Sequence, residues 1–261
     1  MLDDGAVHVW LAFESLLDDP ACAQRLTALM SEEEQARERR FKVESARRLH
    51  LLARGMQREV LSPYLPGTSP RELRFISGPA GRPALAPPFD ASGLVFNISH
   101  AKGLVVLAVT RGGLLGVDVE LYDKKVPLEV ARRFFSPVEA DALEALPGDA
   151  RSRRFLRLWT LKESYLKALG TGIAGGLESA TFRIDDAGAC AFEHAAERHA
   201  ARWSFGQFDV GERHVLAFAR LPVRETRTDL KIEWREFGDV AGLAPNLNIR
   251  PLLGQEQRPE T

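Results

Sequence analysis

The order of the expected secondary structure elements constrains the fold of this chain more than any single residue does. A helical stretch followed by three β-rich segments occurs twice in the 261 residues. The first set begins with the proline-free stretch at 31–61, and the second begins with a long helix at 151–169. Turn residues separate the β segments of each set, which is typical of a meander. This order predicts an α+β fold of two similar halves.

The halves are expected at 1–115 and 116–224, and residues 225–261 follow as an extension of unknown role that ends in a loose tail at 254–261. The expected strands are 7–13, 73–76, 94–98, 104–110, 114–121, 180–184, 201–208 and 215–221. The glycine- and proline-rich segment 78–88 is expected to be irregular.

Capping residues mark the expected helix ends. Ser31 with Glu34 fits a capping box, and so does Ser136 with Glu139, where a proline stands between them at the first helical position. Gly170 follows the 151–169 helix at the place of a C-terminal cap. These signals fix where three helices begin or end.

The bulk composition excludes several classes of protein. Lys plus Arg total 35 and Asp plus Glu total 36, so a formal charge of −1 gives no case for binding nucleic acid or an anionic membrane. The two cysteines, Cys22 and Cys190, lie far apart and suggest neither a disulfide framework nor a zinc site. The N-terminus is acidic, and no apolar run reaches the ~18 residues that a bilayer requires. We therefore expect a soluble cytoplasmic protein.

Two carboxylates stand side by side on one expected strand. Asp118 and Glu120 are two residues apart and share a face, whereas Val117 and Val119 face a core. Neighbouring carboxylates repel each other unless something compensates their charge. A magnesium ion, which prefers oxygen ligands, would do so. The alternative is a solvated polar face on an edge strand.

A second candidate lies on the 151–169 helix. Glu163 and Lys167 are four residues apart and share a face. An isolated pair of this kind is usually an exposed ion pair worth ~0.3–0.5 kcal/mol. Here the apolar neighbours Trp159, Tyr165 and Leu166 favour a partly buried carboxylate that needs a partner.

Further candidates are the segment 97–100 and a set of arginines. Ser99 and His100 do not form a nucleophilic pair, because no G-x-S-x-G motif surrounds the serine. They either cap a turn or donate hydrogen bonds to a phosphate. Arginine forks also suit phosphate oxygens, and Arg82 stands beside a glycine that permits close approach of a ligand. The helical arginines at 37, 39, 40, 47 and 48 form either a phosphate site or a solvated face.

In order and spacing, these segments resemble the Sfp-type 4′-phosphopantetheinyl transferase family. The sequence GVDVE at 116–120 and the sequence WTLKESYLK at 159–167 match the family's two central motifs. Upstream, NISH at 97–100, GRP at 81–83 and RRF at 39–41 match further motifs, as does FFS at 134–136 with Glu139. The resemblance spans roughly 32–183, and its strength lies in six weak motifs arriving in the right order.

The resemblance implies two pseudo-symmetric α+β halves with coenzyme A bound in the cleft between them. It assigns Mg²⁺ to Asp118, Glu120 and Glu163, and charge or proton handling to Lys167. It assigns binding of the phosphates of coenzyme A to Lys162, Arg82, Ser99 and His100, with His100 on the 3′-phosphate. Arg37 would add positive charge near the adenosine, and so would Arg47, for which the match is softer.

The implied reaction is attack by a serine of an apo acyl or peptidyl carrier protein on coenzyme A, which releases adenosine 3′,5′-bisphosphate. Such a transfer needs positioning and charge neutralisation, and a base for the serine, for which Glu163 is the candidate. Lys167 would steady the transferring phosphate, or act as the base if its pKa were lowered. Glu139 either caps its helix or approaches the metal. The family suggests a monomer.

Two other functions remain open at this point. One is a different magnesium-dependent phosphoryl transferase or phosphohydrolase that uses the same three carboxylates. The other is an inactive module that binds coenzyme A or a carrier protein. The sequence does not identify the carrier protein, its pathway or its docking surface, to which the loop 170–177 could contribute.

Overall fold

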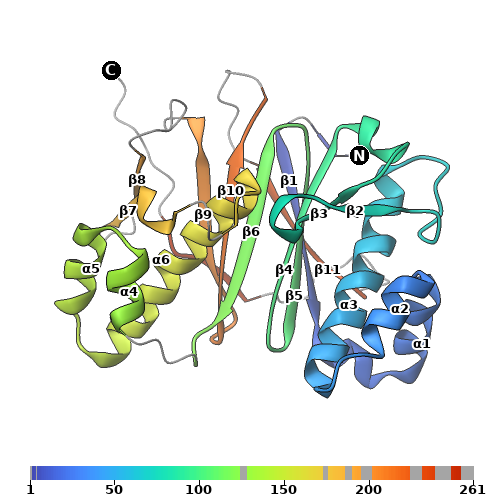
Figure 1. The fold of residues 1–261 in the computed structure, drawn as a ribbon, viewed down its shortest axis with the longest axis horizontal. Coiled ribbons are helices and arrows are strands. Elements are labelled where there is room, and N and C mark those ends of the chain that lie inside the picture. Colours follow the sequence, from blue (N-terminus) through green and yellow to red (C-terminus); the bar gives the residue numbers. More distant parts are fainter. Residues whose placement is uncertain are drawn as a thin grey trace.

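The computed structural model describes residues 2–3, 5–123, 128–172, 176–185, 190–194, 202–223, 231–238 and 248–253. Two four-stranded sheets dominate it, with helices on the outer face of each (Figure 1). The strand orders are β11-β1-β5-β4 and β12-β9-β10-β6. This arrangement confirms the α+β class expected from the sequence.

The first sheet lies against three helices. Its strands are β1 (Ala6–Phe13), β4 (Leu94–Ala101), β5 (Leu104–Arg111) and β11 (Lys231–Glu236). The helices are α1 (Pro20–Leu29), α2 (Glu32–Glu38) and α3 (Glu44–Leu61), and α3 packs directly on β4 and β5. The hairpin of β2 (Phe75–Ser77) and β3 (Pro83–Leu85) lies beside β4.

The second sheet lies against the long helix α6 (Gly148–Leu169), which packs on β6 and β10. Its strands are β6 (Leu114–Leu121), β9 (Ser204–Val210), β10 (His214–Leu221) and β12 (Ile249–Pro251). The helices α4 (Leu128–Phe134) and α5 (Pro137–Glu144) and the hairpin of β7 (Ala180–Ile184) and β8 (Cys190–His194) complete this part. Short 3-10 helices lie at Glu14–Asp18, Ser62–Tyr64, Pro79–Gly81, Phe89–Ser92 and Leu177–Ser179.

The inner faces of the two sheets share a hydrophobic core. Val9 of β1 and Val106 of β5 pack there with Val117 of β6 and Phe218 of β10. Two further core clusters fill the space between each sheet and its helices. The layers therefore run helices, sheet, sheet, helices. At one edge β4 and β6 come close without forming a ladder, because they belong to different sheets. We call this line of contact the seam.

The expected helix ends are confirmed. Ser31 and Glu34 form a capping box at the start of α2, and Glu139 accepts hydrogen bonds from the backbone N–H and hydroxyl of Ser136 at the start of α5. Gly170 adopts the left-handed conformation at the end of α6, with φ of 75°. These caps are local, so the sequence alone could place them.

Several features differ from the expectation, and one of them is the strand β8, which was not expected. The segment 78–88 is not wholly irregular, since β3 lies within it, with Pro83 at the first position of an edge strand. The helices α1 and α4 were not expected, although Asp19 caps α1 and Pro20 begins it. Residues beyond 224 supply edge strands to both sheets, because β11 pairs in parallel with β1 and β12 pairs with β9. The tail at 254–261 lies outside the described residues. Among the described residues, no helix combines the length and apolarity needed to cross a bilayer.

Candidate active site at the seam

A glycine lets α6 lie directly on β6. A Cβ atom placed on Gly116 would lie 1.9 Å from the carbonyl oxygen of Ser164 and 2.5 Å from the backbone nitrogen of Ala168. Only glycine is compatible with such a close approach of two backbones. The glycine of the GVDVE motif therefore sets how close α6 comes to the strand carboxylates.

Lys167 of α6 meets Asp118 of β6 and Ser99 of β4 at this contact. The Lys167 Nζ lies 2.6 Å from Asp118 Oδ1 and 2.9 Å from the Ser99 hydroxyl, which itself donates to Asp118 Oδ1 at 3.0 Å. Asp118 and Ser99 are buried, and the side chain of Lys167 is 29% exposed. The three residues come from three elements, and the sequence expectation that they act at one site gains a geometric basis.

The second oxygen of Asp118 has a different environment. Among the described residues, Oδ2 is buried without a hydrogen-bond partner. A buried carboxylate oxygen without a partner is costly unless another group satisfies it. A hydrogen-bond donor or a cation placed next to Asp118 Oδ2 would therefore stabilise the buried carboxylate.

The other two candidate carboxylates lie along the same contact. Glu120 is two residues after Asp118 on the same face of β6, and Glu163 is one turn before Lys167 on the same side of α6. Within the described ranges, no three acidic, histidine or cysteine side chains gather closely enough to form a ready metal site. In this conformation the ammonium of Lys167 provides the positive charge next to Asp118.

His100 follows Ser99 on β4 and is more than a third exposed. The protein packed around its ring and the Lys167 ammonium both lower the pKa of His100 below its usual value. His100 is therefore neutral near pH 7, and its ring can donate one hydrogen bond to a ligand.

Lys162 does not face the seam. Its side chain is fully buried, and its Nζ donates to the carbonyl oxygens of Leu177, at 2.8 Å, and Ala180. It also forms an ion pair of 2.7 Å with Glu139, which is itself buried. Burial lowers the pKa of Lys162, and Glu139 acts in the opposite direction. The structure therefore does not bring Lys162 together with the other residues that the family resemblance assigns to the phosphates of coenzyme A.

The same contacts decide the role of Glu139. One oxygen accepts from Ser136 and Lys162, and the other accepts from the backbone N–H of Phe182 at 2.8 Å. Both oxygens are used inside the protein, so Glu139 is a helix cap and a partner of Lys162. The alternative in which it approaches the metal is excluded by this geometry.

Arg82 is also used inside the protein. Its guanidinium donates to four backbone carbonyls, those of Lys167 (2.8 Å), Ala168 (2.9 Å), Leu115 (2.9 Å) and Phe96 (3.4 Å). Four of its five N–H groups therefore have protein acceptors, whereas the family resemblance implies a phosphate partner.

The Ser99 hydroxyl donates its hydrogen to Asp118, so in this structure it orients the carboxylate. Asn97, two residues earlier, also contributes to the seam. Its side-chain oxygen accepts a hydrogen bond of 2.8 Å from the backbone N–H of Val117, across the seam. The sequence offered no signal for this contact, since it depends on two sheets meeting.

The candidate arginines Arg37 and Arg47 of the N-terminal helices have different surroundings. Arg37, Arg40 and Phe41 line an open pocket of about 700 Å³ at the end of α2. Arg47 instead lies against the carboxylates of Glu44, at 3.0 Å, and Glu38, at 3.8 Å, so its charge is compensated by protein groups. Arg37 thus lines a pocket that a ligand could enter, whereas Arg47 forms ion pairs with Glu44 and Glu38.

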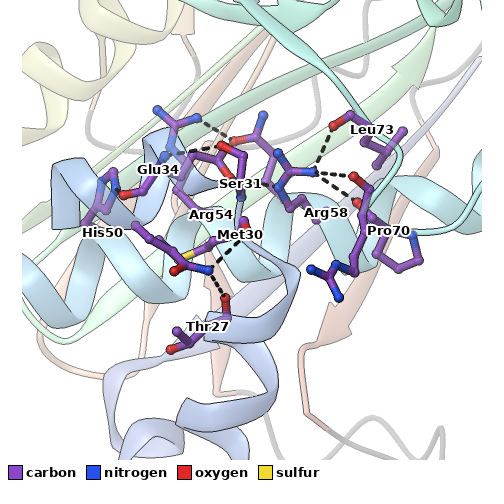
Figure 2. Close-up of polar contacts among 12 residues, drawn as sticks. Thr27, Met30, Ser31, Glu34, His50, Arg54, Arg58, Pro70 and Leu73 are labelled. Carbon is purple, nitrogen blue, oxygen red and sulfur yellow. Dashed lines mark hydrogen bonds and ion pairs between the residues drawn. The ribbon is translucent and has the colours of Figure 1, made fainter. Parts of the chain in front are cut away.

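The pocket is supported by a network that joins α2 to α3 (Figure 2). Glu34 accepts from the backbone N–H of Ser31 and from Arg58, both at 2.9 Å. Arg58 then donates to the carbonyl oxygens of Pro70 and Leu73 in the following loop. The first turn of α2 is thereby fixed relative to α3 and to the loop that follows α3.

Comparison with known proteins identifies the family. A family model described as the 4′-phosphopantetheinyl transferase superfamily matches residues 114–219, and a model of the N-terminal part of 4′-phosphopantetheinyl transferases matches residues 19–112. The chain belongs to the 4′-phosphopantetheinyl transferase superfamily. The boundary between the two matches falls in the turn between β5 and β6.

Curated members of this family are similar over most of their length. The 4′-phosphopantetheinyl transferase HetI of a Nostoc species is 40% identical over 170 residues, covering 64% of this chain and 70% of the relative. The 4′-phosphopantetheinyl transferase Sfp of Bacillus subtilis is 31% identical over 170 residues, covering 65% and 73%. A phosphopantetheinyl transferase of a Thraustochytrium species is 28% identical over 227 residues, covering 82% and 78%.

Among solved structures, the holo-[acyl-carrier-protein] synthase of Thermotoga maritima matches with a TM-score of 0.34 at 22% identity, covering 42% of this chain and 64% of that one. This likeness is too weak to support an argument about the site. Membership of the family rests on the sequence matches.

Proposed function

We propose that the protein transfers the 4′-phosphopantetheine arm of coenzyme A to a serine of an apo acyl or peptidyl carrier protein, releasing adenosine 3′,5′-bisphosphate. The observation that carries this proposal is the contact of Lys167 with Asp118 and Ser99 at the seam, in a chain of the 4′-phosphopantetheinyl transferase superfamily. The helix α6 and the strand β6 place Lys167 and Asp118 at the seam, and phosphoryl transfer requires charged groups that position the phosphate and neutralise its charge.

The carboxylates of the seam have the ligand chemistry that magnesium prefers, although within the described residues they do not lie close enough to share an ion in this conformation. Asp118 offers a buried oxygen without a partner in the described residues, and Glu120 and Glu163 offer oxygen ligands of the kind that magnesium prefers. We propose that these three residues hold the ion when coenzyme A is bound. The ion would supply charge stabilisation to the phosphate oxygens.

The remaining groups of the seam supply positioning and proton transfer. Lys167 is partly exposed and cationic, so its ammonium steadies the transferring phosphate. Ser99 orients Asp118 through its hydroxyl. We propose Glu163 as the base that takes the proton of the carrier serine, because a free serine hydroxyl is a weak nucleophile.

Two residues are proposed to hold the nucleotide part of coenzyme A. His100 lies beside the seam with an exposed ring and donates a hydrogen bond to the 3′-phosphate as a neutral imidazole. Arg37 lines the open pocket on α2 and adds positive charge near the adenosine. Arg47, the softer match, is half exposed and now pairs with Glu44 and Glu38, so coenzyme A would have to compete with these carboxylates for its guanidinium.

An assay of coenzyme A turnover tests the proposal against its closest rival. The purified protein is incubated with coenzyme A and Mg²⁺, with and without apo carrier proteins from fatty-acid, polyketide and peptide synthesis. We expect adenosine 3′,5′-bisphosphate only when an apo carrier is present, and none when EDTA replaces Mg²⁺. Release without any carrier would identify a phosphohydrolase, and binding of coenzyme A without release would identify an inactive binding module.

Three organisational features are also proposed. The division into residues 1–115, 116–224 and an extension at 225–261 follows the motif order, with the extension adding edge strands to both parts. A monomer is supported because one chain supplies all the groups that meet at the seam. A cytoplasmic location is supported by the spacing of the two cysteines, which suits a reducing compartment.

A further inference from the structure

The seam has to be held by side chains, because β4 and β6 share no ladder of backbone hydrogen bonds. Arg82 stands out there, since a single guanidinium binds carbonyl oxygens on three elements, namely α6, β6 and β4. We propose that Arg82 is a positioning residue for phosphopantetheine transfer, which acts by fixing the Lys167–Asp118–Ser99 contact and not by binding coenzyme A. This inference rests on the function proposed above.

Arg82 caps the C-terminal end of α6. The last carbonyl groups of a helix lack partners within the helix and carry partial negative charge. Arg82 satisfies two of them, those of Lys167 and Ala168, with one nitrogen. A cation at this end also stabilises the helix dipole, so Arg82 keeps the last turn of α6 helical.

The last turn of α6 carries Lys167. Lys167, whose carbonyl oxygen Arg82 binds, is the residue whose ammonium reaches Asp118 and Ser99. If the last turn of α6 frayed, the backbone of Lys167 would move, and its ammonium would no longer be held beside Asp118 and Ser99. The backbone contact and the side-chain contact of Lys167 are therefore coupled.

Arg82 also binds the two strands that carry the partners of Lys167. Arg82 binds the carbonyl oxygen of Leu115, three residues before Asp118 on β6, and that of Phe96, three residues before Ser99 on β4. One rigid planar guanidinium thus fixes the relative positions of the three backbone segments that carry Lys167, Asp118 and Ser99. Lysine cannot reproduce this fork of donors, because its ammonium is a single point with three N–H groups.

The burial of Arg82 agrees with this role. Desolvation lowers the pKa of its guanidinium, and carbonyl oxygens account for the partners of both terminal nitrogens. A phosphate ligand would have to replace these carbonyls and would leave them without donors. Arg82 therefore contributes to transfer through the geometry of the seam.

The test separates positioning from ligand binding. Arg82→Lys keeps the charge but loses the fork, and Arg74→Lys, at an exposed position before β2, is the matched control. For each protein, kcat and KM for coenzyme A are measured in the transfer assay, and Kd for coenzyme A is measured by calorimetry. We expect Arg82→Lys to lower kcat by about tenfold or more while Kd changes by less than about threefold, and Arg74→Lys to change neither.

A rise in Kd with an unchanged kcat would show that Arg82 binds coenzyme A and would overturn the inference, as would a variant that matches wild type in both. A second measurement needs no variant: the guanidinium NMR signal of Arg82 is followed in the wild-type protein during titration with coenzyme A. We expect the N–H groups bound to carbonyls to keep their shifts, and large shifts on titration would contradict the proposal. A wild-type protein without transfer activity would sink the proposed function itself, whatever Arg82 does.

Discussion

At the scale of single residues, adjacent positions of one motif have unrelated roles. Lys162 and Glu163 are neighbours in sequence, but successive residues of a helix point about 100° apart. Lys162 therefore enters the core and meets Glu139, whereas Glu163 shares a side of α6 with Lys167. The motif allowed the sequence to predict that Asp118 and Lys167 act together. It could not show which lysine is buried, since that depends on how α6 is rotated against β6.

Replacing Lys162 should affect stability and leave ligand binding unchanged. Lys162→Met leaves the buried carboxylate of Glu139 without its cation, which costs about 3–5 kcal/mol of the free energy of unfolding. Urea denaturation measures this loss, and calorimetry on the folded protein should give the wild-type Kd for coenzyme A. Adding Glu139→Gln to the same chain should recover part of the stability. A weakened Kd at wild-type stability would instead support the phosphate-binding role that the family resemblance implies.

Replacing Glu163 should have the opposite effect. Glu163→Gln removes the proposed base and metal ligand while keeping the side chain's shape, so transfer to an apo carrier should fall by about a thousandfold or more. Circular dichroism and the thermal midpoint should stay close to wild type. The control is Glu212→Gln in the exposed turn before β10, which should transfer normally. Wild-type turnover in Glu163→Gln would remove Glu163 from the mechanism.

At the scale of elements, local signals predicted helices better than strands. The caps at Ser31, Ser136 and Gly170 are local, and each is found where the sequence placed it. The edge strands β11 and β12 carry no such signal, because they form only by pairing with β1 and β9. The same reason explains β3, whose pairing with β2 overrides a segment rich in glycine and proline.

The contact between α6 and β6 should tolerate no side chain at Gly116. Gly116→Ala would place its Cβ against backbone atoms of Ser164 and Ala168, which cannot move without shifting the helix. We expect a loss of about 1–3 kcal/mol or more in the free energy of unfolding, and a larger proportional loss of transfer activity. Gly148→Ala at the start of the same helix meets nothing within 4 Å and should be neutral or slightly stabilising. Equal effects of the two variants in urea denaturation would contradict the close approach.

At the scale of the whole molecule, the two sheets meet through few polar contacts. Asn97 binds the backbone of Val117 across the seam, and His214 of β10 lies 2.9 Å from the carbonyl oxygen of Lys102 in the turn after β4. The sequence predicted two α+β halves and an active site formed by both. It could not predict that the sheets share a core, because that depends on which faces of β1 and β6 turn inward.

The buried histidines should make the protein less stable in mild acid. Burial is the main cause that lowers the pKa of His8, His50 and His214 below 6.5. Between the lowered pKa and 6.5 the unfolded chain binds more protons than the folded one, so the free energy of unfolding falls as the pH drops through this window. Urea denaturation from pH 7.5 to 5 measures the slope. His214→Gln should flatten it, and an unchanged or steeper slope would contradict the role of His214.

Mass spectrometry of an apo carrier protein tests the central claim most directly. The protein, coenzyme A and Mg²⁺ are incubated with the carrier, and the intact carrier is weighed before and after. The account predicts that the carrier gains one phosphopantetheine group on its serine, that the gain requires Mg²⁺, and that the Glu163→Gln variant does not produce it. A panel of apo carriers that all keep their original mass with the wild-type protein would contradict it.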